Sequence, residues 1–97
     1  MASPTKLTPD EIQQRLAALD GWAIEFGMLC RTFQFADFPR AFGFMAAAAT
    51  VAQAMNHHPD WSNVYRTVQV RLSTHDAGGL TELDFQLAGR MNELAGA

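Results

Sequence analysis

The chain has 97 residues, 48% of them apolar, which is enough for one domain with a modest hydrophobic core. A net charge of -3 and the lack of any lysine- or arginine-rich cluster argue against a surface for nucleic acid. No apolar run is as long as a signal peptide or a membrane span, and the single cysteine, Cys30, has no internal disulfide partner. We therefore expect one cytoplasmic domain over 1–97 that does not contact a membrane, with a loosely held or disordered N-terminus at 1–6.

The first elements in chain order are a helix and a hairpin. A hydroxyl at Thr8, a proline after it and a glutamate at Glu11 form a capping box, which predicts that a helix begins there. The segments 22–26 and 29–35 are short and rich in aromatic and β-branched residues. Because Gly27 separates them, they predict a β-hairpin.

A longer helix is predicted from Asp37 to about Met55. Apolar residues at helical spacing form its expected core face: Phe38, Ala41, Phe42, Met45, Ala48, Ala49, Ala52 and Met55. A second apolar stripe follows another side of the helix: Phe44, Ala47, Val51 and Ala54. A helix that is apolar on two sides needs two covers, so we expect the sheet on one side and a second copy of the chain on the other. In the alternative interpretation, the alanines only raise helix propensity.

The second half of the chain predicts two further strands and a last helix. Pro59 ends the long helix, and the segments 62–65 and 68–73 read as strands. A second capping box at 81–84 begins the last helix, whose expected core face is Leu83, Leu87, Met91 and Leu94. The order helix, two strands, helix, two strands, helix predicts an α+β fold. We expect a four-stranded antiparallel sheet with three helices packed on one face.

All three histidines fall in two segments next to turn signals, His57-His58 and His75. If the last two strands pair antiparallel, both segments meet at one edge of the sheet. Because histidine exchanges protons near neutral pH, this arrangement predicts an acid/base site and hence an enzyme. Trp61 is interpreted either as an aromatic wall of this site or as core packing, and the helix start at Thr81 as a source of amide donors.

The chain resembles the pterin-4a-carbinolamine dehydratase family over about 22–88. The resemblance rests on Asn56-His57-His58-Pro59-Asp60-Trp61, Asn63-Val64-Tyr65, Leu72-Ser73-Thr74-His75-Asp76, Gly79-Leu80-Thr81 with Asp84, and Arg31-x-Phe33-x-Phe35-x-Asp37-Phe38 with Ala41 and Phe42. It implies a dehydratase that converts 4a-hydroxytetrahydropterin to quinonoid dihydropterin and water in tetrahydrobiopterin recycling, without a metal or organic cofactor. It also implies a homo-oligomer (a dimer or tetramer, through the long helix or a sheet edge) and an aromatic amino-acid hydroxylase as a pathway partner. The alternative is a non-catalytic dimerisation or regulatory partner protein of the same fold.

The resemblance also implies the site residues. The catalytic histidines are His57, His58 and His75, with His58 expected to protonate the leaving hydroxyl and either of the others to take a ring proton. The substrate-binding set is Gln53, Asn56, His57, His58, Pro59, Trp61, Ser73, Thr74, His75, Asp76 and Asp84. Asp84 has two readings, as a group that orients a histidine and as a cap of the last helix.

The chain departs from the family pattern at Gln53, where many members carry glutamate. A glutamate there would favour the charged form of a neighbouring histidine, whereas glutamine can only hydrogen-bond. We therefore expect a more acidic pH optimum or a lower rate. Ala77, where animal relatives carry cysteine, is expected to be neutral.

A catalytic zinc site is the competing interpretation of three histidines. The side chains of the adjacent His57 and His58 diverge, and no further ligand pattern is present. We therefore expect no metal.

Overall fold

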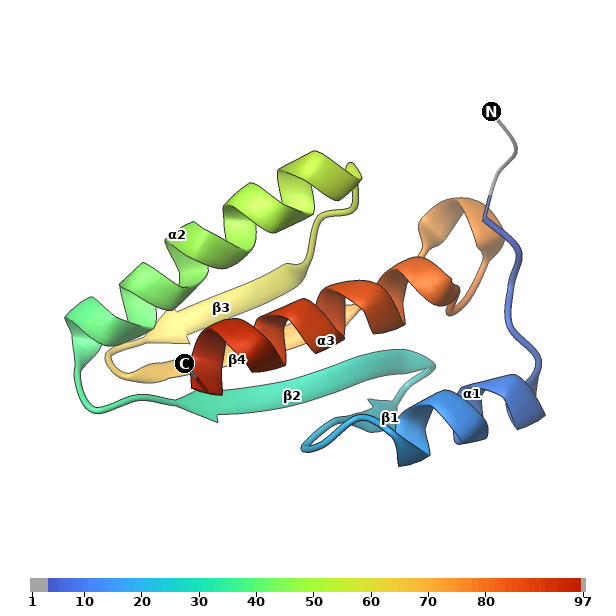
Figure 1. The fold of residues 1–97 in the computed structure, drawn as a ribbon, viewed down its shortest axis with the longest axis horizontal. Coiled ribbons are helices and arrows are strands. Elements are labelled where there is room, and N and C mark those ends of the chain that lie inside the picture. Colours follow the sequence, from blue (N-terminus) through green and yellow to red (C-terminus); the bar gives the residue numbers. More distant parts are fainter. Residues whose placement is uncertain (1–3, 97) are drawn as a thin grey trace.

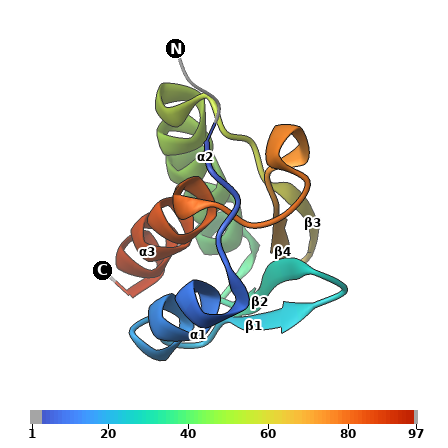
Figure 2. The ribbon, with the colours of Figure 1, turned by 90° about the vertical axis from the view of Figure 1, so that its right-hand side faces the viewer.

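The elements of the computed structural model, which describes residues 4–96, follow the predicted order. They are α1 (Pro9–Ala17), β1 (Ala23–Glu25), β2 (Met28–Gln34), α2 (Phe38–Met55), β3 (Asp60–Val64), β4 (Thr67–Leu72), the short 3-10 helix η1 (His75–Ala77) and α3 (Glu82–Gly96). The strands form one antiparallel sheet in the order β1-β2-β4-β3. The helices lie on one side of it, with α2 and α3 next to each other (Figures 1 and 2). The predicted α+β fold is confirmed.

The capping box at the start of α1 forms as predicted. The Thr8 hydroxyl accepts from the backbone N–H of Glu11 at 3.2 Å, and the Glu11 carboxylate accepts from the N–H of Thr8 at 2.9 Å. The hydrogen bond that the Glu11 carboxylate accepts from the Thr8 backbone, and after it the interaction with the Thr8 side chain, lower the pKa of Glu11 from its ordinary value. Just before the helix, the N–H of Leu7 donates to the carbonyl of Leu80 at 2.8 Å. The expected loose segment 1–6 lies partly outside the described residues, and the chain is anchored from Leu7 onward.

The connection between α1 and β1 is tied to α3 through one amide side chain. Oδ1 of Asn92 accepts from Trp22 Nε1 at 2.7 Å and from Arg31 Nη1 at 2.6 Å, and its Nδ2 donates to the Asp20 carbonyl at 3.0 Å. Gly21 has a φ of +86°, and a Cβ there would come within 2.6 Å of the Arg31 guanidinium carbon. The positive φ favours glycine here, and a Cβ would also displace the Arg31 guanidinium from its hydrogen bonds to Asp20 and Asn92.

The buried face of α2 differs from the prediction. Its buried residues are Ala41, Phe44, Ala48 and Ala52. Phe44 was assigned to the second stripe, yet its ring packs 4.8 Å from that of Phe33 on β2. Phe38 and Phe42, expected in the core, are 46% and 58% exposed. The reason is that a helix with apolar residues on nearly every side has no single preferred face, so the aromatic partners on the sheet decide which side is buried.

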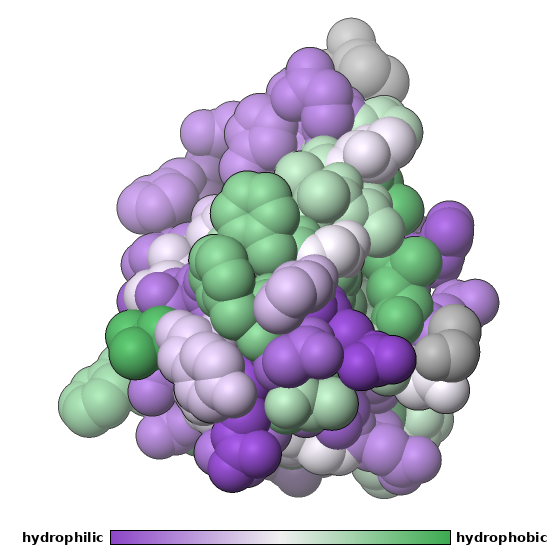
Figure 3. All heavy atoms as spheres, turned by 90° about the vertical axis from the view of Figure 1, so that its left-hand side faces the viewer, coloured by the Kyte–Doolittle hydropathy of each residue, from purple (hydrophilic) through white to green (hydrophobic). Residues whose placement is uncertain are grey.

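An apolar surface therefore remains at the end of the molecule where α2 begins. Phe38 and Phe42 lie with their ring centroids 5.9 Å apart. Val64 and Tyr65, at the turn between β3 and β4, are 77% and 62% exposed, and Figure 1 places this turn at the same end. Figure 3 looks onto this end and shows apolar side chains gathered in its middle.

The predicted alternation in β4 and most of the predicted face of α3 are confirmed. Val68, Val70 and Leu72 are at most 1% exposed, and Leu87 of α3 is fully buried. The remaining members of the predicted α3 face are Met91, which is buried, and Leu83 and Leu94, which are half-buried. Among residues 4–96, no helix is both long enough and apolar enough to cross a membrane.

Candidate active site

The end of α2 turns the first histidine segment toward the interior. The helix stops at Met55 because Asn56 adopts a left-handed conformation (φ 52°, ψ 43°), which asparagine tolerates better than most residues. The N–H of His57 then donates back to the carbonyl of Ala52 at 3.0 Å. As a result, His57 is only 8% exposed while the adjacent His58 is open to solvent. The helix thus ends at Met55, four residues before the proline expected to stop it.

The second histidine lies in a tight loop after β4. The carbonyl of Thr74 accepts from the N–H groups of Ala77 and Gly78, and Thr74 pairs with Gly79 across the loop. This closes a single turn of 3-10 helix that carries His75 at an exposed position.

The two segments meet as the sequence predicted. β3 and β4 pair antiparallel with Asp60 opposite Arg71, so the start of one strand and the end of the other share an edge. Figure 2 shows the α2–β3 connection beside the η1 loop. Between them is an open cleft of about 270 Å³, lined by Asn56, His57, His58, Ser73, Thr74, His75 and Asp76. All three histidines contribute to one surface.

Behind His57 lies a buried carboxylate. Nε2 of His57 is 2.6 Å from Oδ1 of Asp84, which is fully buried at the start of α3. The other oxygen, Oδ2, accepts from the Thr74 hydroxyl and from the N–H of Thr81, both at 2.9 Å. Asp84 therefore fits both interpretations, because the same carboxylate caps the start of α3 and contacts His57.

His58 has its own partner at the surface. Its Nε2 lies 2.9 Å from Oε1 of Gln53, one turn back in α2. An amide oxygen only accepts, so Nε2 of His58 is the donor in this contact. The position at which the chain departs from the family pattern thus contacts a candidate catalytic histidine directly.

The remaining predicted site residues lie outside the cleft lining. Trp61 pairs with the buried Val70, faces the helices and packs half-buried against the core, which is the packing interpretation. Pro59 is also half-buried. The N–H of Thr81 was expected to donate to a ligand. It donates to Asp84 instead, and Thr81 itself is fully buried. The Thr81 hydroxyl lies 2.8 Å from that of Thr74, next to Asp84. The sequence indicated this contact only through the cap position of Thr81, three residues before Asp84.

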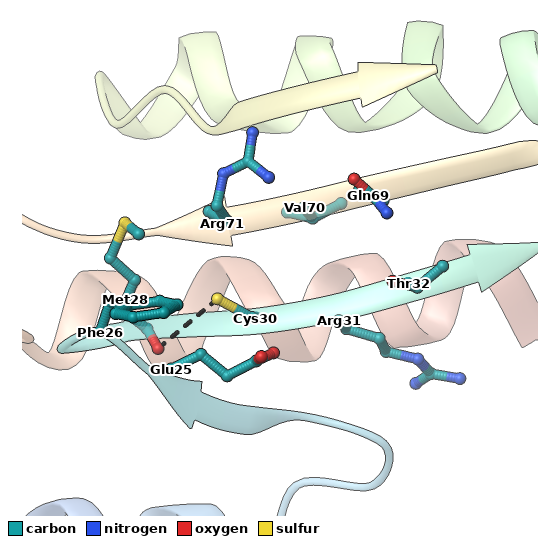
Figure 4. Close-up of a pocket in the computed structure, with 9 residues that line it drawn as sticks. All are labelled: Glu25, Phe26, Met28, Cys30, Arg31, Thr32, Gln69, Val70 and Arg71. Carbon is teal, nitrogen blue, oxygen red and sulfur yellow. Dashed lines mark hydrogen bonds between the residues drawn. The ribbon is translucent and has the colours of Figure 1, made fainter. Parts of the chain in front are cut away.

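A second hollow, of about 290 Å³, lies on the side of the sheet away from the helices. Figure 4 shows its lining, which includes Cys30 of β2 and Gln69 and Arg71 of β4 but no histidine. Burial, and then the charge of Glu25, raise the pKa of the Cys30 thiol. A thiol held in its neutral form is a poor nucleophile, which agrees with Cys30 being a strand residue only.

The histidine cleft is an arrangement of proton donors and acceptors. Within residues 4–96, no group of three His, Cys, Asp or Glu side chains is placed to hold a metal ion. The three histidines line one shared cleft together with the polar residues Asn56, Ser73 and Asp76. Such a set can move protons to and from a bound ring.

A family model described as pterin 4 alpha carbinolamine dehydratase matches residues 5–94 of this sequence. The chain belongs to the pterin 4 alpha carbinolamine dehydratase family. It is similar to proteins provisionally named pterin-4-alpha-carbinolamine dehydratase from Solibacter usitatus (53% identity over 94% of this chain and 96% of the relative) and from Rhizobium johnstonii (50% identity, 93% and 91%). These names are those of a hydro-lyase.

A solved structure shares the fold. A Brucella melitensis protein described as a transcriptional coactivator/pterin dehydratase superposes with a TM-score of 0.92 at 46% identity, covering 94% of this chain and 99% of the other. The fold and the family inferred from the histidine segments are therefore confirmed.

Proposed function

We propose that this pterin dehydratase family member removes water from 4a-hydroxytetrahydropterin by histidine acid/base catalysis, giving quinonoid dihydropterin in tetrahydrobiopterin recycling. The observation that carries the proposal is the convergence of His57, His58 and His75 on one cleft, with His57 held by Asp84 at 2.6 Å. The family of the chain suggests this reaction, and the histidines of the cleft are groups suited to acid/base catalysis.

The reaction requires an acid for the hydroxyl that leaves C4a and a base for a ring N–H proton. His58 is exposed and can exchange protons with solvent, which suits it to protonating the hydroxyl. His57 or His75 then takes the ring proton. Positioned groups of this kind contribute about 10²- to 10⁴-fold to a rate. Asn56, Ser73 and Asp76 are proposed to hold the pterin by polar contacts.

The dehydration rate of substrate generated in situ by a hydroxylase tests this function. Wild-type protein is expected to accelerate dehydration, and His58→Ala to remove most of the acceleration, by about 10²-fold. Gln69→Ala, on the opposite face of the sheet, is the control and keeps the wild-type rate. A folded wild-type protein without any acceleration would contradict the proposal.

Self-association is a second proposed property. The exposed surface of Phe38 and Phe42 on α2 is apolar, and β3 is an edge strand. We propose that a second copy covers one or both, giving a dimer or tetramer. The Brucella protein is described as a coactivator as well as a dehydratase, which keeps a non-catalytic dimerisation or regulatory role as the alternative function. A cytoplasmic location and a hydroxylase as pathway partner remain predictions.

A further inference from the structure

The hydroxyls of two buried threonines form a chain of hydrogen bonds that ends at the Asp84 carboxylate. As a carboxylate, Asp84 only accepts hydrogen bonds, so the Thr74 hydroxyl, 2.9 Å from Oδ2, must donate to it. The Thr74 oxygen is then free to accept from the Thr81 hydroxyl at 2.8 Å. Oγ1 of Thr81 in turn accepts from the N–H of Leu83 at 3.3 Å. The chain of donors runs from Thr81 through Thr74 to Asp84.

The Asp84 carboxylate that this chain holds determines which nitrogen of His57 carries its proton, because a carboxylate oxygen can only accept. Oδ2 of Asp84 is occupied by the Thr74 hydroxyl and the Thr81 N–H, so Oδ1 is left to accept from Nε2–H of His57. Every buried side-chain nitrogen or oxygen among residues 4–96 has a partner. Nδ1 of His57 bonds to none of those residues and is therefore not a buried atom, and His57 itself lines the cleft. The lone pair of Nδ1 is left free to accept a proton.

Thr74 also joins this network to the other histidine segment. Its N–H donates to the carbonyl of Gly79 at 3.0 Å, and its own carbonyl closes the turn that carries His75. Thr74 is in the cleft lining but is only 6% exposed, and its hydroxyl is bonded to Asp84 and Thr81. One residue thus sets the backbone under His75 and the carboxylate behind His57.

We propose that Thr74 is a positioning residue for the dehydration, holding Asp84 so that Nδ1 of His57 is the acceptor presented to the pterin. The inference rests on the proposed function and deepens it. A ring N–H proton passes to Nδ1 of His57, and the acid's proton joins the departing hydroxide as the C4a–O bond breaks, so that water is lost. The resulting imidazolium keeps its Nε2–H bond to Asp84, whose negative charge stabilises it.

Thr74→Val tests the proposal, since it keeps the shape of the side chain and removes the hydroxyl. Long-range ¹H–¹⁵N spectra of the ligand-free protein identify the protonated ring nitrogen of His57. We expect Nε2 in wild type and a mixture of tautomers in Thr74→Val, with kcat lowered about tenfold and KM nearly unchanged. Thr74→Ser, which restores a hydroxyl, is expected to recover both. Thr32→Val, the same change on the far side of the sheet, is expected to alter neither.

The outcomes separate this inference from the proposed function. An unchanged tautomer and kcat in Thr74→Val, or a raised KM at unchanged kcat, would overturn the positioning role while leaving the dehydratase intact. Equal damage by Thr74→Ser would also overturn it. If Thr74→Val does not fold, the wild-type spectrum decides alone, because a proton on Nδ1 of His57 contradicts the proposal without any activity measurement.

Discussion

Nε2 of His57 lies 2.6 Å from Oδ1 of Asp84, and the carboxylate has no exposed surface. Leu83 separates Asp84 from Glu82, a solvent-exposed carboxylate in the same first turn of α3. Removing a partner from a buried, charge-assisted hydrogen bond leaves polar groups without water or protein to satisfy them. The pair therefore links the stability of the α3 start to the orientation of a candidate catalytic ring.

Asp84→Asn is expected to lower kcat about 10- to 100-fold, corresponding to roughly 1.5–3 kcal/mol for a lost hydrogen bond to a charged group. The amide cannot accept all three donors that meet the carboxylate. Steady-state kinetics together with urea unfolding measure both effects. The matched control is Glu82→Gln, whose ion pair with Arg15 is exposed and is expected to matter little. Equal kinetics for the two variants would contradict a role of Asp84 at the site.

Gln53→Glu is expected to move the pH–rate profile to higher pH. The new carboxylate would take the place of Oε1, now 2.9 Å from Nε2 of His58, and would favour the imidazolium form of that ring. The profile of kcat/KM against pH for wild type and variant measures the shift. An unshifted profile would show that the residue at position 53 does not affect the protonation of His58 on which the reaction depends.

Phe42→Glu is expected to lower the oligomeric state, because it places a charge within the exposed apolar surface of α2. Light scattering gives the mass directly. The same change at Val51, which packs half-buried against the core, is expected to reduce stability instead. A mass unaffected by Phe42→Glu would exclude this part of α2 as the interface.

Gly21→Ala is expected to destabilise the fold by about 1–3 kcal/mol, since it combines a φ of +86° with a clash against the Arg31 guanidinium. Gly89→Ala is the matched control, because this helical glycine has open space around it. It is expected to be neutral or to stabilise by up to about 1 kcal/mol. Chemical unfolding of both variants measures the difference, and equal stabilities would contradict the account of the α1–β1 connection.

The elements and their order followed from local signals, whereas the packing of α2 did not. Capping residues such as Thr8 and alternation along β4 act within a few residues, so the sequence displays them directly. The burial of Phe44 in place of Phe38 depends on Phe33 across the sheet, which no local pattern encodes.

The same distinction applies to the site. The convergence of His57 with His75 could be inferred from the expected antiparallel pairing of the last two strands. The contact of Asp84 with His57 and the burial of Thr81 depend on how the start of α3 meets the end of β4. These are tertiary relationships between segments far apart in sequence, so residue types alone left the role of Asp84 open.

The most direct test of the central claim is a titration of the wild-type protein with an unreactive dihydropterin, followed through the ring ¹⁵N signals of the three histidines. The account predicts that His57, His58 and His75 all shift with one common affinity, while signals of Gln69 and Cys30 on the open face of the sheet do not. Shifts confined to that open face, or binding that leaves the histidines unchanged, would contradict a pterin site in the histidine cleft.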